Sequence, residues 1–319
     1  MNARSAPAPR IGISACLLGQ RVRYDGGHKK DAFVTGVLAR FVSLVAVCPE
    51  VELGLGTPRE SIRLERDGEL VRLVAPKSGR DHTDAMRRYA ERRVAEIEAL
   101  DLCGYILKKD SPSCGMEHVR VHAGRRASRT GRGAFAAVIL ERMPLLPVEE
   151  EGRLRDLKLR ESFVERVFAY RRLRDLLGGG GDAGDVVRFH AREKLLVLAH
   201  DPEAYRRLGR LVARGREVPR GELAERYANA YMAALGKLAT RGRHANVLQH
   251  IAGHVKELAT RDERAELSDA IADFRRGLAP LVVPVTLLAH HVRRHGIEQL
   301  AGQSYLEPHP RELMLRNHV

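Results

Sequence analysis

Three short apolar runs in the first 115 residues each end close to a cysteine, and this pattern restricts the fold more than any other feature. Residues 10–15 precede Cys16, residues 42–47 precede Cys48, and residues 104–107 precede the loop that holds Cys114. Short apolar runs bounded by turn-forming residues are typical of buried β-strands. Because ligands bind beyond the carboxyl ends of parallel strands, we expect the three thiols to meet at one sheet edge as candidate metal ligands.

The segments between these runs predict an α/β domain. A helix is expected over residues 31–40, with Asp31 as its N-cap, and a strand follows it at once. That order implies a parallel, right-handed crossover. Residues 61–74 predict a β-hairpin and residues 83–100 a helix. We therefore expect residues 10–148 to form a small, mostly parallel, Rossmann-like sheet with helices.

The remainder of the chain has the periodicity of helices. Apolar residues recur every three to four positions beyond about residue 186, which predicts an all-α C-terminal domain over residues 186–319. Residues 149–185 are expected to hold a connecting helix followed by a Gly-rich linker. Residues 1–9 are expected to be a disordered N-terminus.

Charge and cysteine content restrict the partners and the compartment. The net charge is +14, from 55 Lys and Arg against 41 Asp and Glu, and this basic surface permits binding to tRNA or another nucleic acid. The cationic residues lie among carboxylates, however, which favours a solvated surface. The sequence predicts no membrane span or signal peptide, so we expect a cytoplasmic protein without membrane contact. In that compartment its four cysteines are expected to be metal-bound, catalytic or buried.

Three thiolates can hold an iron-sulfur cluster while one iron stays open to act as a Lewis acid. The spacing of the cysteines matches neither a ferredoxin run nor a paired zinc motif, so buried thiols without a metal remain an equal alternative on spacing alone. Their neighbours favour a site. Glu50 lies beside the second cysteine, Ser111 and Ser113 lie beside the third, and Lys108 and Arg59 add positive charge. Cys103 is interpreted as a buried structural thiol.

Four motifs occur in order within residues 10–148, and together they resemble the TudS-type thiouracil desulfidase family. They are Ser14-Ala15-Cys16-Leu17-Leu18-Gly19, Tyr24-Asp25-Gly26, Cys48-Pro49-Glu50 with Pro58-Arg59, and Lys108-Lys109-Asp110-Ser111-Pro112-Ser113-Cys114-Gly115.

The resemblance implies a 4Fe-4S cluster held by Cys16, Cys48 and Cys114, with the fourth iron free of protein ligands. It implies Glu50 as the catalytic acid/base and Ser111 as its polar partner. We also expect four residues to contact the substrate: Asp25, Arg59, Lys108 and Ser113. The substrate would be a small thiolated base or nucleoside such as thiouracil, and the reaction a hydrolytic cleavage of the C–S bond. A nucleic-acid-associated module with a structural cluster remains the alternative.

The second half resembles the YbgA-type helical domain through residues 243–250 and 303–310. That resemblance indicates little about the chemistry of the second half. His250, His254 and Glu257 fall on one helical face in a geometry able to bind a metal, but they interleave with apolar residues, so polar helix packing or a substrate contact is the preferred interpretation. Further candidate histidines are His244, His290, His291 and His295.

Overall fold

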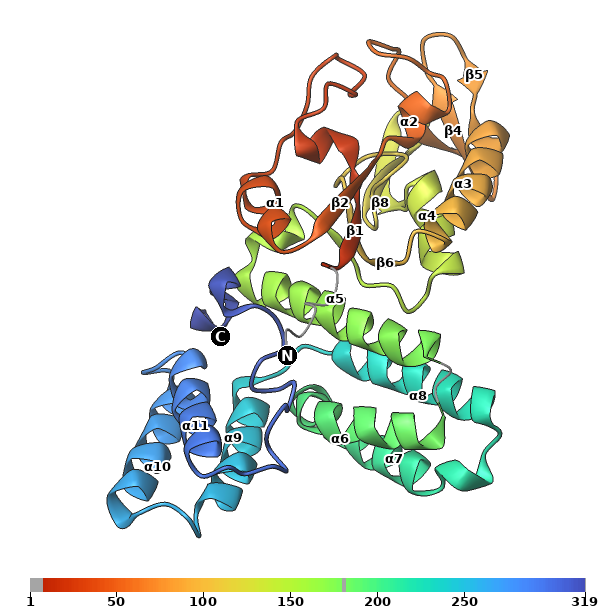
Figure 1. The fold of residues 1–319 in the computed structure, drawn as a ribbon. Helices are drawn as coiled ribbons and strands as arrows, with labels where there is room; N and C mark the ends of the chain where they lie inside the picture. The colour runs from red at the N-terminus through yellow and green to blue at the C-terminus, as the bar shows by residue number, and fades with distance from the viewer. Residues whose placement is uncertain (1–7, 180–181, 319) are drawn as a thin grey trace. The chain divides into compact units, whose positions relative to one another are not determined.

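The computed structural model describes residues 8–179 and 182–318 (Figure 1). Residues 1–7 of the expected disordered N-terminus, and residues 180–181 of the expected linker, lie outside the described residues. Strands and short helices in the first half and helices in the second confirm the predicted fold class.

The chain divides into two compact units, Met1–Arg155 and Asp156–Val319. The connecting helix expected between two domains is the first helix of the second unit, α5 (Leu157–Gly178). Within the part of the chain that the structure describes, no helix is long and apolar enough to cross a membrane.

The first unit contains a parallel sheet with the strand order β2-β1-β6-β9. β1 (Arg10–Ser14) pairs with β2 (Ser43–Val47) and with β6 (Leu102–Leu107), and β9 (Val148–Glu150) lies at the edge beside β6. Every residue of β6 is buried, as expected of a strand covered on both faces. The three apolar runs therefore form β1, β2 and β6 of one sheet, as predicted.

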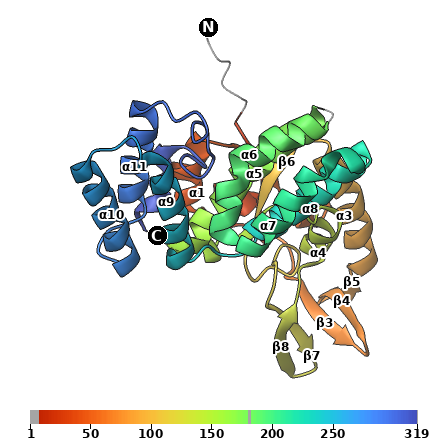
Figure 2. The same ribbon diagram turned by 90° about the horizontal axis from the view of Figure 1, so that it is seen from below.

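A second sheet of five strands completes this unit, in the order β5-β4-β3-β7-β8 (Figure 2). β3 (Arg63–Asp67) and β4 (Leu70–Ala75) form the predicted hairpin, and β5 (Arg80–Asp81), β7 (Val119–Ala123) and β8 (Arg126–Gly131) extend it. The sequence analysis did not predict β7 and β8. Five of the six residues of β8 are exposed, so this strand lacks the apolar pattern that identifies a strand in a sequence.

Within residues 8–155 the first unit has four α-helices: α1 (Ala32–Gly36), α2 (Pro49–Glu52), α3 (Thr83–Glu98) and α4 (Ala134–Arg142). Three 3-10 turns accompany them: η1 (Ala15–Leu18), η2 (Leu38–Arg40) and η3 (Arg153–Arg155). Asp31 caps α1 as predicted, since its carboxylate accepts a hydrogen bond from the Val34 N–H at 2.9 Å. The helix predicted over residues 31–40 is α1 followed by η2.

The second unit contains seven α-helices within residues 156–179 and 182–318. After α5 they are α6 (Ala183–His200), α7 (Pro202–Ala213), α8 (Arg220–Leu235), α9 (Arg241–Val255), α10 (Arg261–Arg276) and α11 (Val282–Arg294). Helices α9, α10 and α11 pack against one another (Figure 1). The C-terminal segment returns to the buried core, where the Tyr305 hydroxyl lies 3.1 Å from Nδ1 of His244.

Candidate active site

A cavity of about 410 Å³ lies in the first unit, beyond the carboxyl ends of β1, β2 and β6. Cys16, Cys48 and Cys114 all line it. The cavity therefore lies where the sequence analysis expected the three thiols to converge, at the ligand-binding edge of a parallel sheet.

Each thiol is positioned by the element that follows its strand. Cys16 lies in η1, directly after β1, and Cys48 follows β2 and donates its N–H to the Glu52 carboxylate at 3.0 Å. Cys114 lies in the loop after β6 and donates its N–H to Oγ of Ser111 at 3.0 Å. Backbone and side-chain hydrogen bonds thus hold the loops that carry the second and third thiols.

The loop of Cys114 is clamped against the N-terminus of α4. The Phe135 N–H donates to the Ser113 carbonyl at 3.0 Å, and the Ala134 N–H donates to the Pro112 carbonyl at 3.0 Å. Gly133 makes this approach possible, because a Cβ there would lie 2.5 Å from the Ser113 carbonyl. These contacts fix the position of the third thiol.

The surroundings of the three thiols make their ionisation costly. Burial, opposed by Lys108 and assisted by the neighbouring Cys48, raises the pKa of Cys16 to about 11. Burial also raises the pKa values of Cys48 and Cys114, and a hydrogen bond with Ser14 lowers that of Cys114. Three nearby thiolates are therefore costly without a soft metal to neutralise them.

The donor set itself fits an iron-sulfur cluster, which binds thiolate sulfurs. Three cysteines share one cavity, and no fourth cysteine lines it among the described residues. Cys103 lies in β6, is fully buried and has its Sγ 3.8 Å from the Asp101 carbonyl oxygen, which agrees with its interpretation as a structural thiol.

Glu50 and Arg59 form an ion pair at the cavity wall. Nε of Arg59 donates to Oε2 of Glu50 at 3.0 Å, and 6% of the Arg59 side chain and 14% of the Glu50 side chain are exposed. Nη1 of Arg59 donates to the carbonyls of Val22, at 2.9 Å, and Gly56, at 2.8 Å. The guanidinium is therefore held by protein oxygens, and its main contact is the carboxylate.

Ser111 and Lys108 line the same cavity. Oγ of Ser111 accepts hydrogen bonds from the N–H groups of Ser113, at 3.2 Å, and Cys114. A hydroxyl that accepts twice still has its own proton to donate. Nζ of Lys108 pairs with the Glu151 carboxylate and donates to the Lys109 carbonyl at 2.9 Å.

The structure does not bring Asp25 or Ser113 to the cavity lining. The Asp25 carboxylate is exposed and accepts a hydrogen bond from the Gly27 N–H at 3.0 Å, so it stabilises a turn. Ser113 is fully buried. Sequence reasoning missed Ser14 instead, which lines the cavity, accepts the Lys108 N–H at 3.0 Å and hydrogen-bonds to Cys114. Its position at the end of β1, two residues before Cys16, is the signal that could have identified it.

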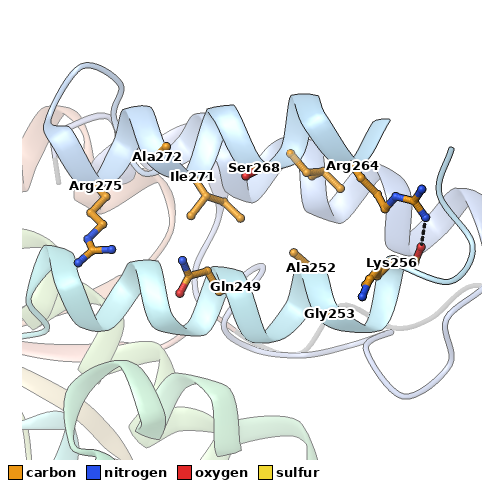
Figure 3. Close-up of a pocket in the computed structure, with 10 residues that line it drawn as sticks. Gln249, Ala252, Gly253, Lys256, Arg264, Ser268, Ile271, Ala272 and Arg275 are labelled. Carbon is orange, nitrogen blue, oxygen red and sulfur yellow. Dashed lines mark hydrogen bonds between the residues drawn. The ribbon is translucent and has the colours of Figure 1, made fainter. Parts of the chain in front are cut away.

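The second unit contains a separate cavity of about 470 Å³ between α9 and α10 (Figure 3). Its polar lining consists of Gln249, Lys256, Arg264, Ser268 and Arg275, without a thiol or a carboxylate. This cavity offers none of the thiols or carboxylates of the first cavity, so the first cavity is the better candidate of the two.

Comparison with known proteins agrees with this division. Residues 11–151 match the family described as 2-thiouracil desulfurase, and residues 194–310 match a protein family of unknown function, DUF1722. The chain is 32% identical over 161 residues to the uncharacterized protein YbgA of Escherichia coli K12, covering 49% of this chain and 94% of YbgA. It is 30% identical over 132 residues to the uncharacterized protein YbbK of Bacillus subtilis 168, covering 40% of this chain and 87% of YbbK.

The chain belongs to the 2-thiouracil desulfurase family, with a DUF1722 region joined to it. The resemblance drawn from the cysteine motifs and from the C-terminal motifs is thereby confirmed. One similar solved structure is described as a [4Fe-4S]-dependent thiouracil desulfidase TudS. It is 36% identical to this chain, and the match covers 48% of this chain and 98% of the solved one, with a TM-score of 0.39.

Proposed function

We propose that the first unit removes sulfur from a small thiolated base such as 2-thiouracil, using a 4Fe-4S cluster held by Cys16, Cys48 and Cys114. The observation that supports it most is the single cavity that these three thiols share with Glu50. Membership of the 2-thiouracil desulfurase family supports the substrate class. When bound, the cluster would supply an iron without a protein ligand, a Lewis acid suited to a soft thiocarbonyl sulfur.

In this proposal Glu50 is the general base. Water would attack the thiocarbonyl carbon while its proton passes to Glu50. The C–S bond would then break, so that the base leaves as a carbonyl compound and the sulfur as hydrosulfide. Arg59 would orient the Glu50 carboxylate, since its guanidinium is already held by Glu50 and two backbone carbonyls.

Ser111 would donate its free hydroxyl proton to the substrate or to the negative charge that develops on it, because its Oγ lone pairs are engaged by two backbone N–H groups. Lys108 would keep the cavity positive beside Cys16. We retain Asp25 and Ser113 only as residues that shape the loops around the cavity.

The decisive experiment is anaerobic purification with iron and sulfide counting, followed by measurement of hydrosulfide released from 2-thiouracil. We expect turnover by the cluster-loaded protein, none from Glu50→Gln with an unchanged cluster spectrum, and no intact cluster in Cys114→Ala. Cys103→Ala is the matched control, because this buried thiol lies outside the cavity, and it should retain the cluster. Polynucleotide binding with steep salt dependence and no hydrosulfide release would replace this proposal with the nucleic-acid alternative.

A further inference from the structure

Two neighbouring helices of the second unit bring together three potential metal ligands. Glu263 lies in the first turn of α10, His291 lies in the last turn of α11, and His295 follows directly as the C-cap residue of α11. One ligand atom from each residue lies within 4.8 Å of the others. The two imidazoles are four positions apart on one helical face, and their rings stack at a centroid distance of 5.8 Å.

The two histidines have unsatisfied nitrogens. Nδ1 of His291 and Nε2 of His295 are buried and have no hydrogen-bond partner among the described residues, and only 2% of His291 is exposed. Buried polar nitrogens normally have a partner, so this pair requires an explanation. A metal ion would satisfy both, because the lone pair of a neutral imidazole is a common metal ligand.

Glu263 retains the capacity to bind a cation. Its Oε2 accepts the Thr260 N–H at 2.8 Å, and its Oε1 pairs with Arg294, but a carboxylate offers about four acceptor positions. The Arg294 side chain is 56% exposed, so it is free to turn toward solvent when a cation arrives. Tetrahedral coordination at about 2.1 Å requires donors about 3.4 Å apart, and the three ligand atoms already lie within 4.8 Å of one another.

The candidate pair singled out from the sequence lacks this arrangement. His250 and His254 on α9 have the same spacing, with ring centroids 5.3 Å apart, but both are exposed. Neither belongs to a group of three metal-ligating side chains among the described residues, and Glu257 is exposed as well.

We propose that Glu263, His291 and His295 bind a divalent transition-metal ion, with Zn²⁺ as the expected occupant. Two imidazoles and one carboxylate form a set that zinc uses in open sites, where water fills the fourth position. The site is separate from the thiols of the first unit and does not depend on the proposed desulfidase activity.

The test is a zinc titration of the full chain, purified anaerobically with its cluster loaded, against a competing chelator. We expect the chain to bind about one zinc ion in addition to the metal of the cluster. His291→Ala and His295→Ala should each lower the zinc affinity by at least about 100-fold, which is more than the replacement of a residue that only hydrogen-bonds to a ligand causes. His250→Ala and His254→Ala are the matched controls and should bind zinc as the parent chain does.

Glu263→Gln is the variant that tests the carboxylate without disturbing the helix. Gln preserves the capping-box hydrogen bond to Thr260 but removes the charged ligand. It should weaken zinc binding with unchanged helical circular dichroism. Cobalt is the spectroscopic probe. The spectrum is taken as the difference between the chain with and without cobalt, so that the bands of the cluster cancel, and nitrogen and oxygen ligands add no sulfur charge-transfer band to that difference. Failure to bind zinc, equal affinity in His291→Ala, or a cobalt difference spectrum with sulfur bands would each overturn the proposal.

Discussion

Arg59 donates from Nε to Oε2 of Glu50 across 3.0 Å, and both side chains are largely withdrawn from solvent. The same guanidinium donates hydrogen bonds to the backbone carbonyls of Val22 and Gly56. These loops therefore set the position of Arg59, and through it the orientation of Glu50. This relationship makes Arg59 a positioning residue for the carboxylate that we propose as the base.

Replacement of Arg59 by alanine should therefore lower kcat/KM for 2-thiouracil by about 100-fold or more, because misplacing a catalytic group by about 1 Å has that effect. Activity is measured per cluster-loaded chain, since breaking a buried pair also destabilises the fold by about 3–5 kcal/mol. Arg63→Ala, which removes a more exposed ion pair with Glu65, is the control. Parent-like turnover in Arg59→Ala would show that Glu50 does not need this partner.

Gly133→Ala should displace the loop that carries Cys114. The added Cβ would meet the Ser113 carbonyl at 2.5 Å and the Gly115 nitrogen at 2.7 Å, both of them backbone atoms. We expect a loss of about 1–3 kcal/mol in unfolding free energy, the usual cost of overpacking, together with less iron per folded chain. At Gly36 a Cβ meets nothing within 4 Å, so Gly36→Ala should bind iron normally. Equal iron content in the two variants would contradict the role assigned to Gly133.

Glu161 in α5 should make the second unit less stable as pH rises. Burial, and then the nearby Glu165, raise the pKa of Glu161 to about 7, while Arg316 and His200 oppose the change. Between about pH 4.5 and 7 the folded chain keeps a proton that the unfolded chain has released, so this group's stabilisation is lost as pH rises, by up to about 3 kcal/mol.

Glu161→Gln should remove that dependence and raise stability at pH 8. Urea unfolding followed by helical circular dichroism from pH 4 to 8 measures it, with the exposed Glu266→Gln as control. A pH profile that is as steep in Glu161→Gln as in the parent chain would assign the effect to another group.

Glu193→Ala should destabilise the second unit by about 3–5 kcal/mol. Arg172 donates to both oxygens of Glu193, at 2.7 and 3.0 Å, and the Tyr231 and Ser304 hydroxyls donate to it at 2.7 and 2.6 Å. Removal of the fully buried carboxylate leaves these donors without their acceptor. Glu222→Ala, which breaks an exposed pair with Arg226, should change the unfolding free energy by less than about 1 kcal/mol. Similar losses in the two variants would contradict this difference.

Local patterns in the sequence determined the strands that carry the thiols and the helical nature of the second unit. Apolar runs of strand length end beside Cys16 and Cys48, and a strand can be identified from such a run because the pattern lies within the run itself. The cap at Asp31 was predictable for the same reason, since it involves a hydrogen bond three residues away.

Only the tertiary structure decided which polar side chains meet. Three features depend on contacts between loops that are distant in the sequence. They are the pairing of Arg59 with Glu50, the hydrogen bond between Ser14 and Cys114, and the position of Asp25 outside the cavity lining. The same holds for the histidines. His250–His254 and His291–His295 share one spacing in the sequence, and only the packing of α10 against α11 places a carboxylate beside the second pair. Spacing along one helix sets which side chains share a face, whereas a third ligand from another helix is a long-range contact that no local pattern encodes.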